Sequence, residues 1–179
     1  MSPAPPGGER AEEVNPFVHD ALPGRVVFGV GAVDRVADEV ARLGLRRVLV
    51  VASGSAKAVG DRIAAALGDR HAGDLGDVRQ HVPADLAAAA RRTAREVAAD
   101  AVVTVGGGSA IGLGKAVAVD PDAPVGGVTV VAVPTTYSGS EMTPIYGITG
   151  VATDRHPSSI RGPATGADPY RVATDRHKQ

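Results

Sequence analysis

The sequence predicts an α/β fold in which helices flank a parallel, Rossmann-like sheet. Short, unbroken apolar runs recur along the chain, as expected of strands that are buried on both faces. Segments with helical periodicity alternate with these runs, which is the pattern that βαβ units produce. Hydrophobic residues make up 44% of the 179 residues and aromatic residues only 3%, so the core consists of Ala, Val, Leu and Ile.

The bulk composition limits the classes of function. The chain is long enough for one domain with a proper core. Its net charge is −1, from 19 basic and 20 acidic residues, so no field of one sign attracts nucleic acid or an anionic membrane. It has no cysteine for disulfides or thiolate zinc sites. No apolar run approaches the roughly 20 residues of a membrane span, and no signal-peptide pattern opens the chain. We therefore expect a cytoplasmic protein.

The first part of the chain predicts a tail, a strand and a helix. Residues 1–15 are rich in Pro, Gly and charge, and we expect them to be disordered. Residues 25–28 predict a strand, and apolar residues at helical spacing over 33–40 predict a helix that ends at Gly44. Between them, Gly29 and Gly31 are interpreted as a plain turn, with a phosphate contact as the alternative.

A second strand is predicted over residues 47–52, followed by a loop and a helix that places Ile63 and Leu67 on one face. Ser53 follows the strand, at a position where dinucleotide folds often carry an Asp for the ribose hydroxyls. Charge at this position therefore does not select against a 2′-phosphate. Residues 70–82 are expected to be irregular, with His71 and His81 as loop or helix-entry residues, and a long helix follows from residue 83 to 99.

The most informative stretch is a strand, a glycine turn and a helix over residues 101–119. An apolar strand is followed by Gly106, Gly107 and Gly108, and Ser109 begins the helix. The absence of β-carbons allows close approach, and the backbone N–H groups and the helix dipole favour an anion. We interpret the turn as a pyrophosphate cradle, with a plain tight turn as the alternative. It is not a Walker A loop, because Ala116 replaces the required Ser or Thr.

A further strand is predicted over residues 128–133, and a hydroxyl-rich stretch over residues 134–141 follows it. Such residues at the carboxyl end of a parallel strand, beside a phosphate loop, lie where an α/β sheet binds its ligand. A Ser/Thr-rich turn without a ligand is the alternative from composition alone.

The character of the sequence changes beyond Gly150. Residues 150–179 have no helical or strand period, and we expect them to form an irregular, disordered tail. The hexapeptide VATDRH occurs twice, at 151–156 and 172–177. A metal site from its Asp154, His156, Asp175 and His177 is disfavoured, because Asp-x-His places the two side chains on opposite faces of a strand. The dinucleotide-binding domain is therefore assigned to residues 16–149.

Three segments of the chain resemble maleylacetate reductases of the iron-containing alcohol dehydrogenase superfamily. They read VHDALPGRVVFGVGAV, GGGSAIGLGKAVAV and PTTYSGSEMTPIYGIT. The wider superfamily usually has Asp where Gly112 stands and a longer PTTxGTGSE loop, so these two departures favour the maleylacetate reductase branch. The resemblance covers about residues 15–149.

The resemblance implies the N-terminal domain of the iron-containing alcohol dehydrogenase and dehydroquinate synthase-like fold. It also implies reduction of maleylacetate to 3-oxoadipate by NADH or NADPH, a step in aromatic compound degradation. Gly107, Gly108 and Ser109 would hold the pyrophosphate, and Lys115 would lie at the back of the cradle helix. The predicted cofactor-binding set is Ser53, Gly106, Gly107, Gly108, Ser109, Lys115, Thr135, Thr136, Tyr137, Ser138 and Ser140.

Family members continue into a helical domain that carries the substrate cleft and the metal positions, and nothing after Thr149 resembles it. We expect this chain to lack that domain, through truncation or a frame change, and we assign no catalytic residue and no metal ligand. Three hypotheses remain: a maleylacetate reductase or a piece of one, a nucleotide-binding module without turnover, and another iron-type alcohol or glycerol dehydrogenase. The substrate would be a small molecule, and a homodimer is left open.

Overall fold

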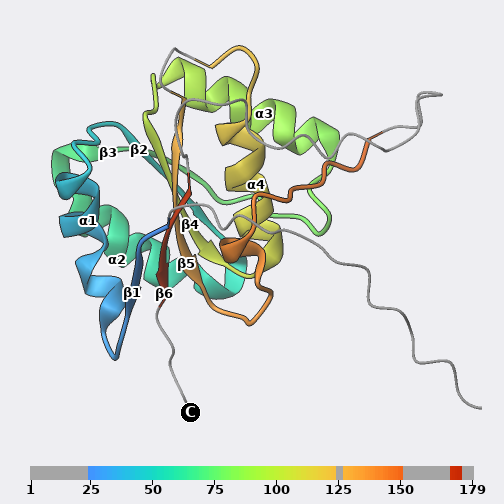
Figure 1. Ribbon diagram of the computed structural model, residues 1–179. Coiled ribbons are helices and arrows are strands. Elements are labelled where there is room, and N and C mark those ends of the chain that lie inside the picture. The colour runs from blue at the N-terminus through green and yellow to red at the C-terminus, as the bar shows by residue number, and fades with distance from the viewer. Residues whose placement is uncertain (1–23, 124–126, 151–169, 175–179) are drawn as a thin grey trace, which may run out of the picture.

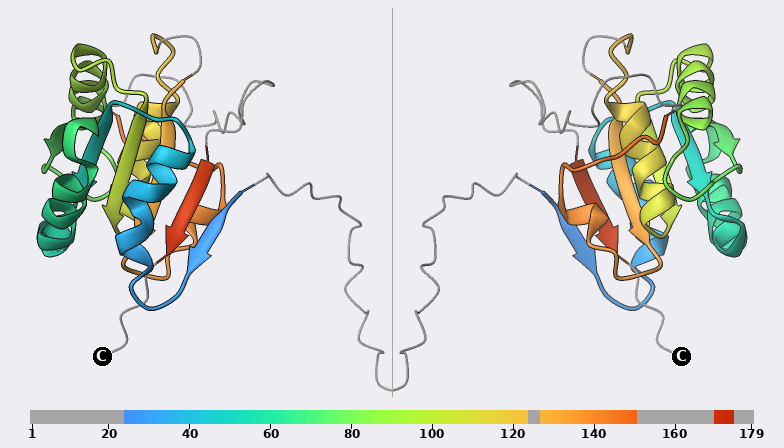
Figure 2. Two further views of the ribbon diagram at one scale, coloured as in Figure 1. Left: turned by 90° about the vertical axis from the view of Figure 1, so that its left-hand side faces the viewer. Right: turned by 90° about the vertical axis from the view of Figure 1, so that its right-hand side faces the viewer.

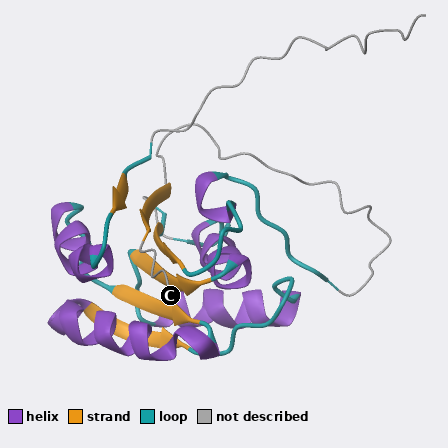
Figure 3. Cartoon of the chain, turned by 90° about the horizontal axis from the view of Figure 1, so that it is seen from below, coloured by secondary structure: helices purple, strands orange, loops and turns teal. Residues whose placement is uncertain are grey.

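A computed structural model describes residues 24–123, 127–150 and 170–174, which form a six-stranded sheet with helices on both faces (Figure 1). The strand order is β1-β6-β5-β4-β2-β3, and every neighbouring pair is parallel. Figure 3 shows the strands lying between the helices. The predicted α/β fold with a parallel sheet is confirmed.

The strands are β1 (Val26–Phe28), β2 (Val48–Ala52), β3 (His71–Leu75), β4 (Ala101–Gly106), β5 (Thr129–Pro134) and β6 (Tyr170–Thr174). The α-helices are α1 (Val36–Arg42), α2 (Lys57–Leu67), α3 (Ala84–Glu96) and α4 (Gly108–Ala118). Short 3-10 turns are η1 (Ala32–Arg35), η2 (Gly54–Ala56), η3 (Gly68–Arg70) and η4 (Ser140–Met142).

Alternation along the strands divides most of the core into two large clusters, one on each face of the sheet. Val48 and Val50 of β2 pack with α1 and α2, whereas Leu49 and Val51 pack with α3 and α4. Every residue of β4 is buried, which fits a strand covered by helices on both faces. Figure 2 shows β1 and β6 toward one side of the sheet and β3 toward the other.

The helical stripes read from the sequence are the buried faces of the helices. Val36 and Val40 are buried in α1, and Ile63 and Leu67 in α2. In α3 the buried residues are Leu86, Ala87, Ala90 and Ala94. Gly44 follows α1 with a φ of 72°, so it ends the helix in the left-handed conformation, as predicted.

The expectation of an irregular segment over residues 70–82 is wrong for its first part. His71–Leu75 forms the edge strand β3, which pairs with β2 in parallel. None of the residues of β3 is fully buried, and its sequence HAGDL contains no apolar run from which a strand could be predicted. His71 therefore lies in a strand rather than a loop, and its Nε2 is 3.0 Å from Asp74 Oδ1.

The expectation that nothing packs beyond Gly150 is wrong for Tyr170–Thr174. These residues form β6, which lies between β1 and β5 and pairs with both. Val172 aligns with Val26 on one side and Ala132 on the other. The backbone of β6 supplies hydrogen-bond partners to two strands, and a five-residue strand among charged and turn-forming residues leaves no periodicity to read.

Other expectations for the two ends lie outside the described residues. They concern the N-terminal tail, the rest of the segment beyond Gly150, and the residues Asp154, His156, Asp175 and His177. Within the described ranges, no helix combines the length and apolar character that a membrane span requires.

Candidate functional site

The glycine turn is the tightest junction between a strand and an α-helix in the described part of the sheet. β4 ends at Gly106 and α4 begins at Gly108, so only Gly107 separates them. Gly106 has a φ of 149°, which favours glycine, and a β-carbon there would lie 2.9 Å from both Ala110 Cβ and Ser53 Oγ. No other residue fits this position without displacing its neighbours.

Hydroxyl side chains from two other loops lie against the glycine turn. A β-carbon at Gly107 would lie 2.9 Å from Thr136 Oγ1, and one at Gly108 would lie 3.5 Å from Ser138 Cβ. Thr135 donates its backbone N–H to the Gly106 carbonyl at 3.0 Å. The loops after β2, β4 and β5 therefore meet at the carboxyl edge of the sheet, where α/β folds bind ligands.

The structure thus brings together most of the predicted cofactor-binding set. Ser53, Thr136 and Ser138 lie at the glycine turn, and Thr135 is bonded to it. Tyr137 lies on the same loop, and 77% of its surface is exposed. The binding role of each residue stays a prediction.

The earlier glycine pair differs from this arrangement. Backbone N–H groups of Ala32 and Asp34 donate to the carbonyls of Gly29 and Gly31 at 3.2 and 3.0 Å. These bonds are those of a turn that begins η1, which is the predicted plain turn. A phosphate contact at Gly29 and Gly31 was only the alternative.

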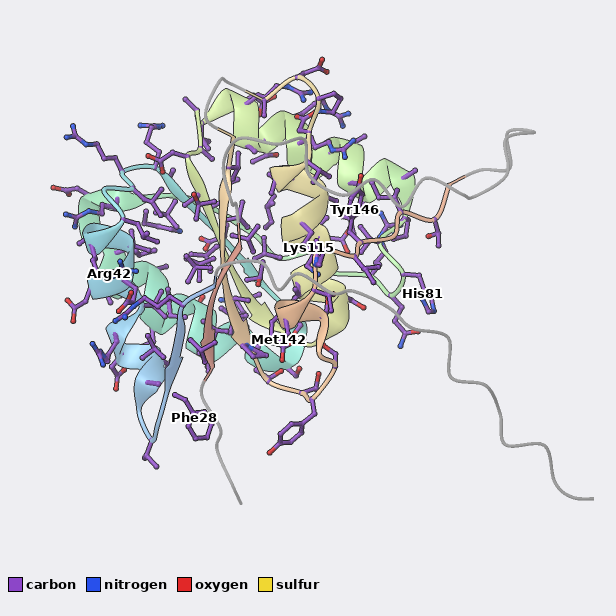
Figure 4. The ribbon with its side chains drawn as sticks, in the orientation of Figure 1. Phe28, Arg42, His81, Lys115, Met142 and Tyr146 are labelled. Atoms are coloured by element: carbon purple, nitrogen blue, oxygen red, sulfur yellow. The ribbon has the colours of Figure 1, made fainter. Side chains whose placement is uncertain are left out.

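Lys115 lies on α4 with only 1% of its surface exposed (Figure 4). Its ammonium donates to the carbonyls of Thr143 and Ile145 at 2.7 and 2.8 Å, and to the carbonyl of Ser140. Ser140 Oγ lies 3.3 Å away. Burial lowers the pKa of Lys115 to about 8, and the Glu141 carboxylate opposes that shift.

A cleft of about 560 Å³ opens beside the first turns of α4. One wall is α4 itself, and the facing walls are the turn before α3 and the segment that follows η4. Its lining residues are His81, Val82, Gly108, Ser109, Gly112, Ser140, Ile145, Tyr146, Gly147, Ile148 and Thr149. Gly112 keeps the cleft open, because a β-carbon there would lie 3.0 Å from Val82 Cγ2.

The cleft is bordered by backbone in a rarely adopted conformation. His81 and Val82 have φ angles of 61° and 46°, which are unusual for any residue with a β-carbon. Thr149 locks this turn: its Oγ1 donates to the His81 carbonyl at 2.9 Å and its N–H to the Val82 carbonyl at 3.1 Å. Ala84 in turn donates its N–H to the Thr149 carbonyl at 2.8 Å. Strained backbone of this kind concentrates at functional sites.

Sequence reasoning missed this cleft. His81 was expected to be a loop or helix-entry residue, and no role was assigned to Tyr146, Ile148 or Thr149. Tyr146, Ile148 and Thr149 belong to the segment PTTYSGSEMTPIYGIT, which carries the resemblance to maleylacetate reductases. The resemblance marks these residues but does not show that they line a cleft. The pairing of residues 81–82 with residue 149 spans too much of the chain for any local pattern to show it.

Comparison with known proteins gives consistent results. The family model of iron-containing alcohol dehydrogenases matches residues 23–168. The maleylacetate reductase of Rhizobium sp. (strain MTP-10005) is 43% identical over 104 residues, which are 58% of this chain and 30% of the relative. The crystal structure of the maleylacetate reductase of Agrobacterium tumefaciens superposes with a TM-score of 0.73 at 38% identity.

That superposition covers 90% of this chain and 43% of the solved chain. The sulfoacetaldehyde reductase of Bifidobacterium kashiwanohense, solved in complex with NAD+, has a TM-score of 0.70 at 21% identity and shares the fold. The chain therefore spans less than half the length of these relatives.

Proposed function

The chain belongs to the iron-containing alcohol dehydrogenase family of oxidoreductases, and we propose that it forms the nucleotide-binding half of a maleylacetate reductase that uses NADH or NADPH. The observation that carries the proposal is the glycine turn between β4 and α4, with hydroxyl groups from the loops after β2 and β5 lying against it. We also infer a role in the degradation of aromatic compounds, which the resemblance to maleylacetate reductases implies, and a cytoplasmic location, which the sequence leads us to expect.

The residues of the turn fit a dinucleotide diphosphate. Gly107 and Gly108 lie at the N-terminus of α4 without side chains to cover their backbone, and N–H groups and the helix dipole favour an anion there. Thr136 and Ser138 place hydroxyl donors beside them, close enough that a β-carbon at Gly107 would meet the Thr136 hydroxyl. Ser53 follows β2 and lies beside Gly106, and it carries no charge that would repel a 2′-phosphate.

The chain's own contribution to the reaction is binding and alignment. When bound, the reduced nicotinamide supplies a hydride for a substrate whose carbonyl oxygen takes up negative charge. The glycine turn would hold the diphosphate, and the adjacent cleft would take one arm of the cofactor and part of a small substrate. Holding two reactants in a fixed geometry removes most of the entropic part of the barrier.

Nucleotide binding by this chain tests the proposal directly. We expect purified chain to raise and shift NADH fluorescence, and Gly107→Val to abolish this effect, because its branched side chain would occupy the space of the phosphate and of Thr136. Gly76→Val is the matched control, because a β-carbon at Gly76 has no neighbour within 4 Å. Equal NADH affinity of the two variants would show that the cradle is misassigned.

Turnover separates the enzyme from its alternative, a nucleotide-binding module. The absorbance at 340 nm is followed with NADH and maleylacetate, where oxidation of NADH lowers it, and then with NAD+ and glycerol or simple alcohols, where reduction of NAD+ raises it. Steady NADH oxidation with maleylacetate supports a reductase within this chain. Binding without oxidation favours the module, which is consistent with the chain covering 43% of the solved maleylacetate reductase.

A further inference from the structure

Four hydrogen bonds join the buried cation on α4 to one segment of the chain. Lys115 is the only lysine that is buried in the described residues, and the acceptors of these four bonds lie between Ser140 and Ile145. A buried ammonium is unfavourable unless it is hydrogen-bonded, and these carbonyl and hydroxyl oxygens supply those bonds. A lysine ammonium has three donors around one nitrogen, which suits three carbonyl oxygens that converge from one loop.

Apolar burial does not hold that segment in place. Met142 and Ile145 are the large apolar side chains of residues 140–145, and they are 64% and 57% exposed. Its backbone bonds are local: Met142 and Thr143 donate N–H groups to the carbonyls of Gly139 and Ser140 at 3.0 and 3.3 Å. The segment therefore depends on contacts from outside itself, and Lys115 on α4 provides hydrogen bonds to the carbonyls of Ser140, Thr143 and Ile145.

The same segment forms part of the cleft. Ser140 and Ile145 line it together with Tyr146, and the facing wall is the first two turns of α4, at Ser109 and Gly112. Because Lys115 belongs to that helix, its bonds fix the separation between the two walls. Figure 4 shows Lys115, Tyr146 and His81 on the same side of the sheet.

We propose that Lys115 is a positioning residue that holds residues 140–145 against α4 and so sets the shape of the cleft in which one arm of the cofactor binds. Its link to cofactor binding rests on the proposed function. Lys115 would act on cofactor binding through its bonds to the backbone carbonyls of this segment. It would not need to contact the phosphates directly.

The test compares Lys115→Met with Lys57→Met. Methionine fills nearly the same space without donors, and Lys57 is an exposed lysine bonded to Asp61 on α2. We expect Lys115→Met to weaken NADH binding about tenfold or more, the loss expected when a wall of a binding site is displaced. Amide hydrogen exchange should accelerate over residues 139–149 and remain unchanged over residues 101–106. Lys57→Met should change neither. Wild-type NADH affinity and wild-type exchange in Lys115→Met would overturn the proposal.

Chemical restoration of the ammonium at position 115 is a second test of the proposal. The chain has no cysteine, so Lys115→Cys can be alkylated at one site with 2-bromoethylamine, which forms the S–C bond, releases bromide and leaves a lysine analogue. Alkylation in denaturant followed by refolding, with the wild-type chain taken through the same steps, should recover NADH affinity and slow exchange. If the refolded wild-type chain binds NADH and the alkylated chain does not, the proposal is overturned. This comparison remains valid even if Lys115→Met does not fold.

The two hypotheses fail in different ways. Hydrogen exchange on the free protein requires no nucleotide and therefore tests the positioning of residues 140–145 alone. If the wild-type chain binds neither NADH nor NADPH, the proposed function fails. If it binds NADH but Lys115→Met leaves residues 139–149 protected, only the positioning role fails.

Discussion

Glu39 and Lys115 are buried charged residues on opposite faces of the sheet, and their charges are satisfied by different chemistry. Glu39 on α1 is 6% exposed and forms ion pairs with Arg25 and Arg42 at 2.9 and 2.8 Å. Lys115 on α4 is 1% exposed and donates to backbone carbonyls. The acid meets long, half-exposed side chains at a rim, whereas the cation meets the backbone of a loop.

The difference indicates two separate tasks. The ion pair with Arg25 joins the start of β1 to α1, which secures an edge strand and is a matter of stability. The bonds of Lys115 join α4 to residues that line the cleft, which is a matter of site geometry. A buried charge can thus contribute either to stability or to the geometry of a site, and its bonding partner indicates which of the two it does.

The largest effect we expect concerns how closely each face packs its helices. A β-carbon at Gly114 of α4 would lie 2.2 Å from Thr104 Cγ2, and one at Gly60 of α2 would lie 2.7 Å from Ala52 Cβ. Gly114→Ala should destabilise the fold by about 3 kcal/mol, because overpacking of a core exceeds the gain in helix propensity. Gly60→Ala should cost about 1 kcal/mol, since the contact is less severe. Urea unfolding measures both.

A second substitution checks the cause of the Gly114 effect. Thr104→Ser deletes the methyl group that the new β-carbon would meet and keeps the hydroxyl. The double variant should regain most of the stability lost in Gly114→Ala, as a double-mutant cycle would show. Additive losses would mean that α4 is not seated on β4 through Gly114.

The next effect concerns the acid on the other face. The Arg25 guanidinium holds the pKa of Glu39 at about 2, with help from Arg42 and against the effect of burial. Because this pKa lies below its ordinary value of 4.5, the stabilisation is complete above that value and is lost as the pH falls toward 2. Glu39→Gln should lose about 2 kcal/mol at pH 7. Its stability should then vary less between pH 4.5 and 2 than that of the wild type. Parallel profiles would contradict the pairing.

A smaller effect tests whether the cleft side of the sheet is the binding side. Thr136 is exposed and lies beside Gly107, so Thr136→Val removes a hydroxyl without disturbing the core. We expect NADH binding to weaken about tenfold, which is about 1.4 kcal/mol and typical of one lost hydrogen bond to a charged group. Thr93→Val, the same substitution on α3 and outside the predicted cofactor-binding set, is the control. Unchanged affinity in Thr136→Val would remove this hydroxyl from the phosphate site.

Local sequence patterns predict the parts of this fold that depend on residues close together in the sequence. The glycine triplet, the strand before it and the helix after it were all predicted, because apolar runs, glycines and helical spacing are local signals. The meeting of Ser53, Thr136 and Gly107 follows from one further rule, that parallel strands end at the same edge.

The remaining features depend on partners far along the chain. β3 and β6 take part in the sheet through backbone pairing, which requires no apolar run. The acceptors of Lys115 lie 25 to 30 residues beyond it, and carbonyl oxygens are present at every residue, so no sequence pattern distinguishes them. The left-handed turn at His81 and Val82 carries no glycine to indicate it.

The smallest effect serves as the reference for both buried charges. Lys57 Nζ lies 2.7 Å from Asp61 Oδ2 on α2, and the side chains are 73% and 61% exposed. An exposed pair four residues apart on a helix contributes about 0.3–0.5 kcal/mol, because solvent screens it and holding two long side chains costs entropy. Lys57→Met should therefore change the free energy of unfolding by less than about 0.5 kcal/mol, and added salt should remove that change. Urea unfolding at low and high salt measures it, and a loss as large as that of Glu39→Gln would show that burial is not what separates the interior charges from this one.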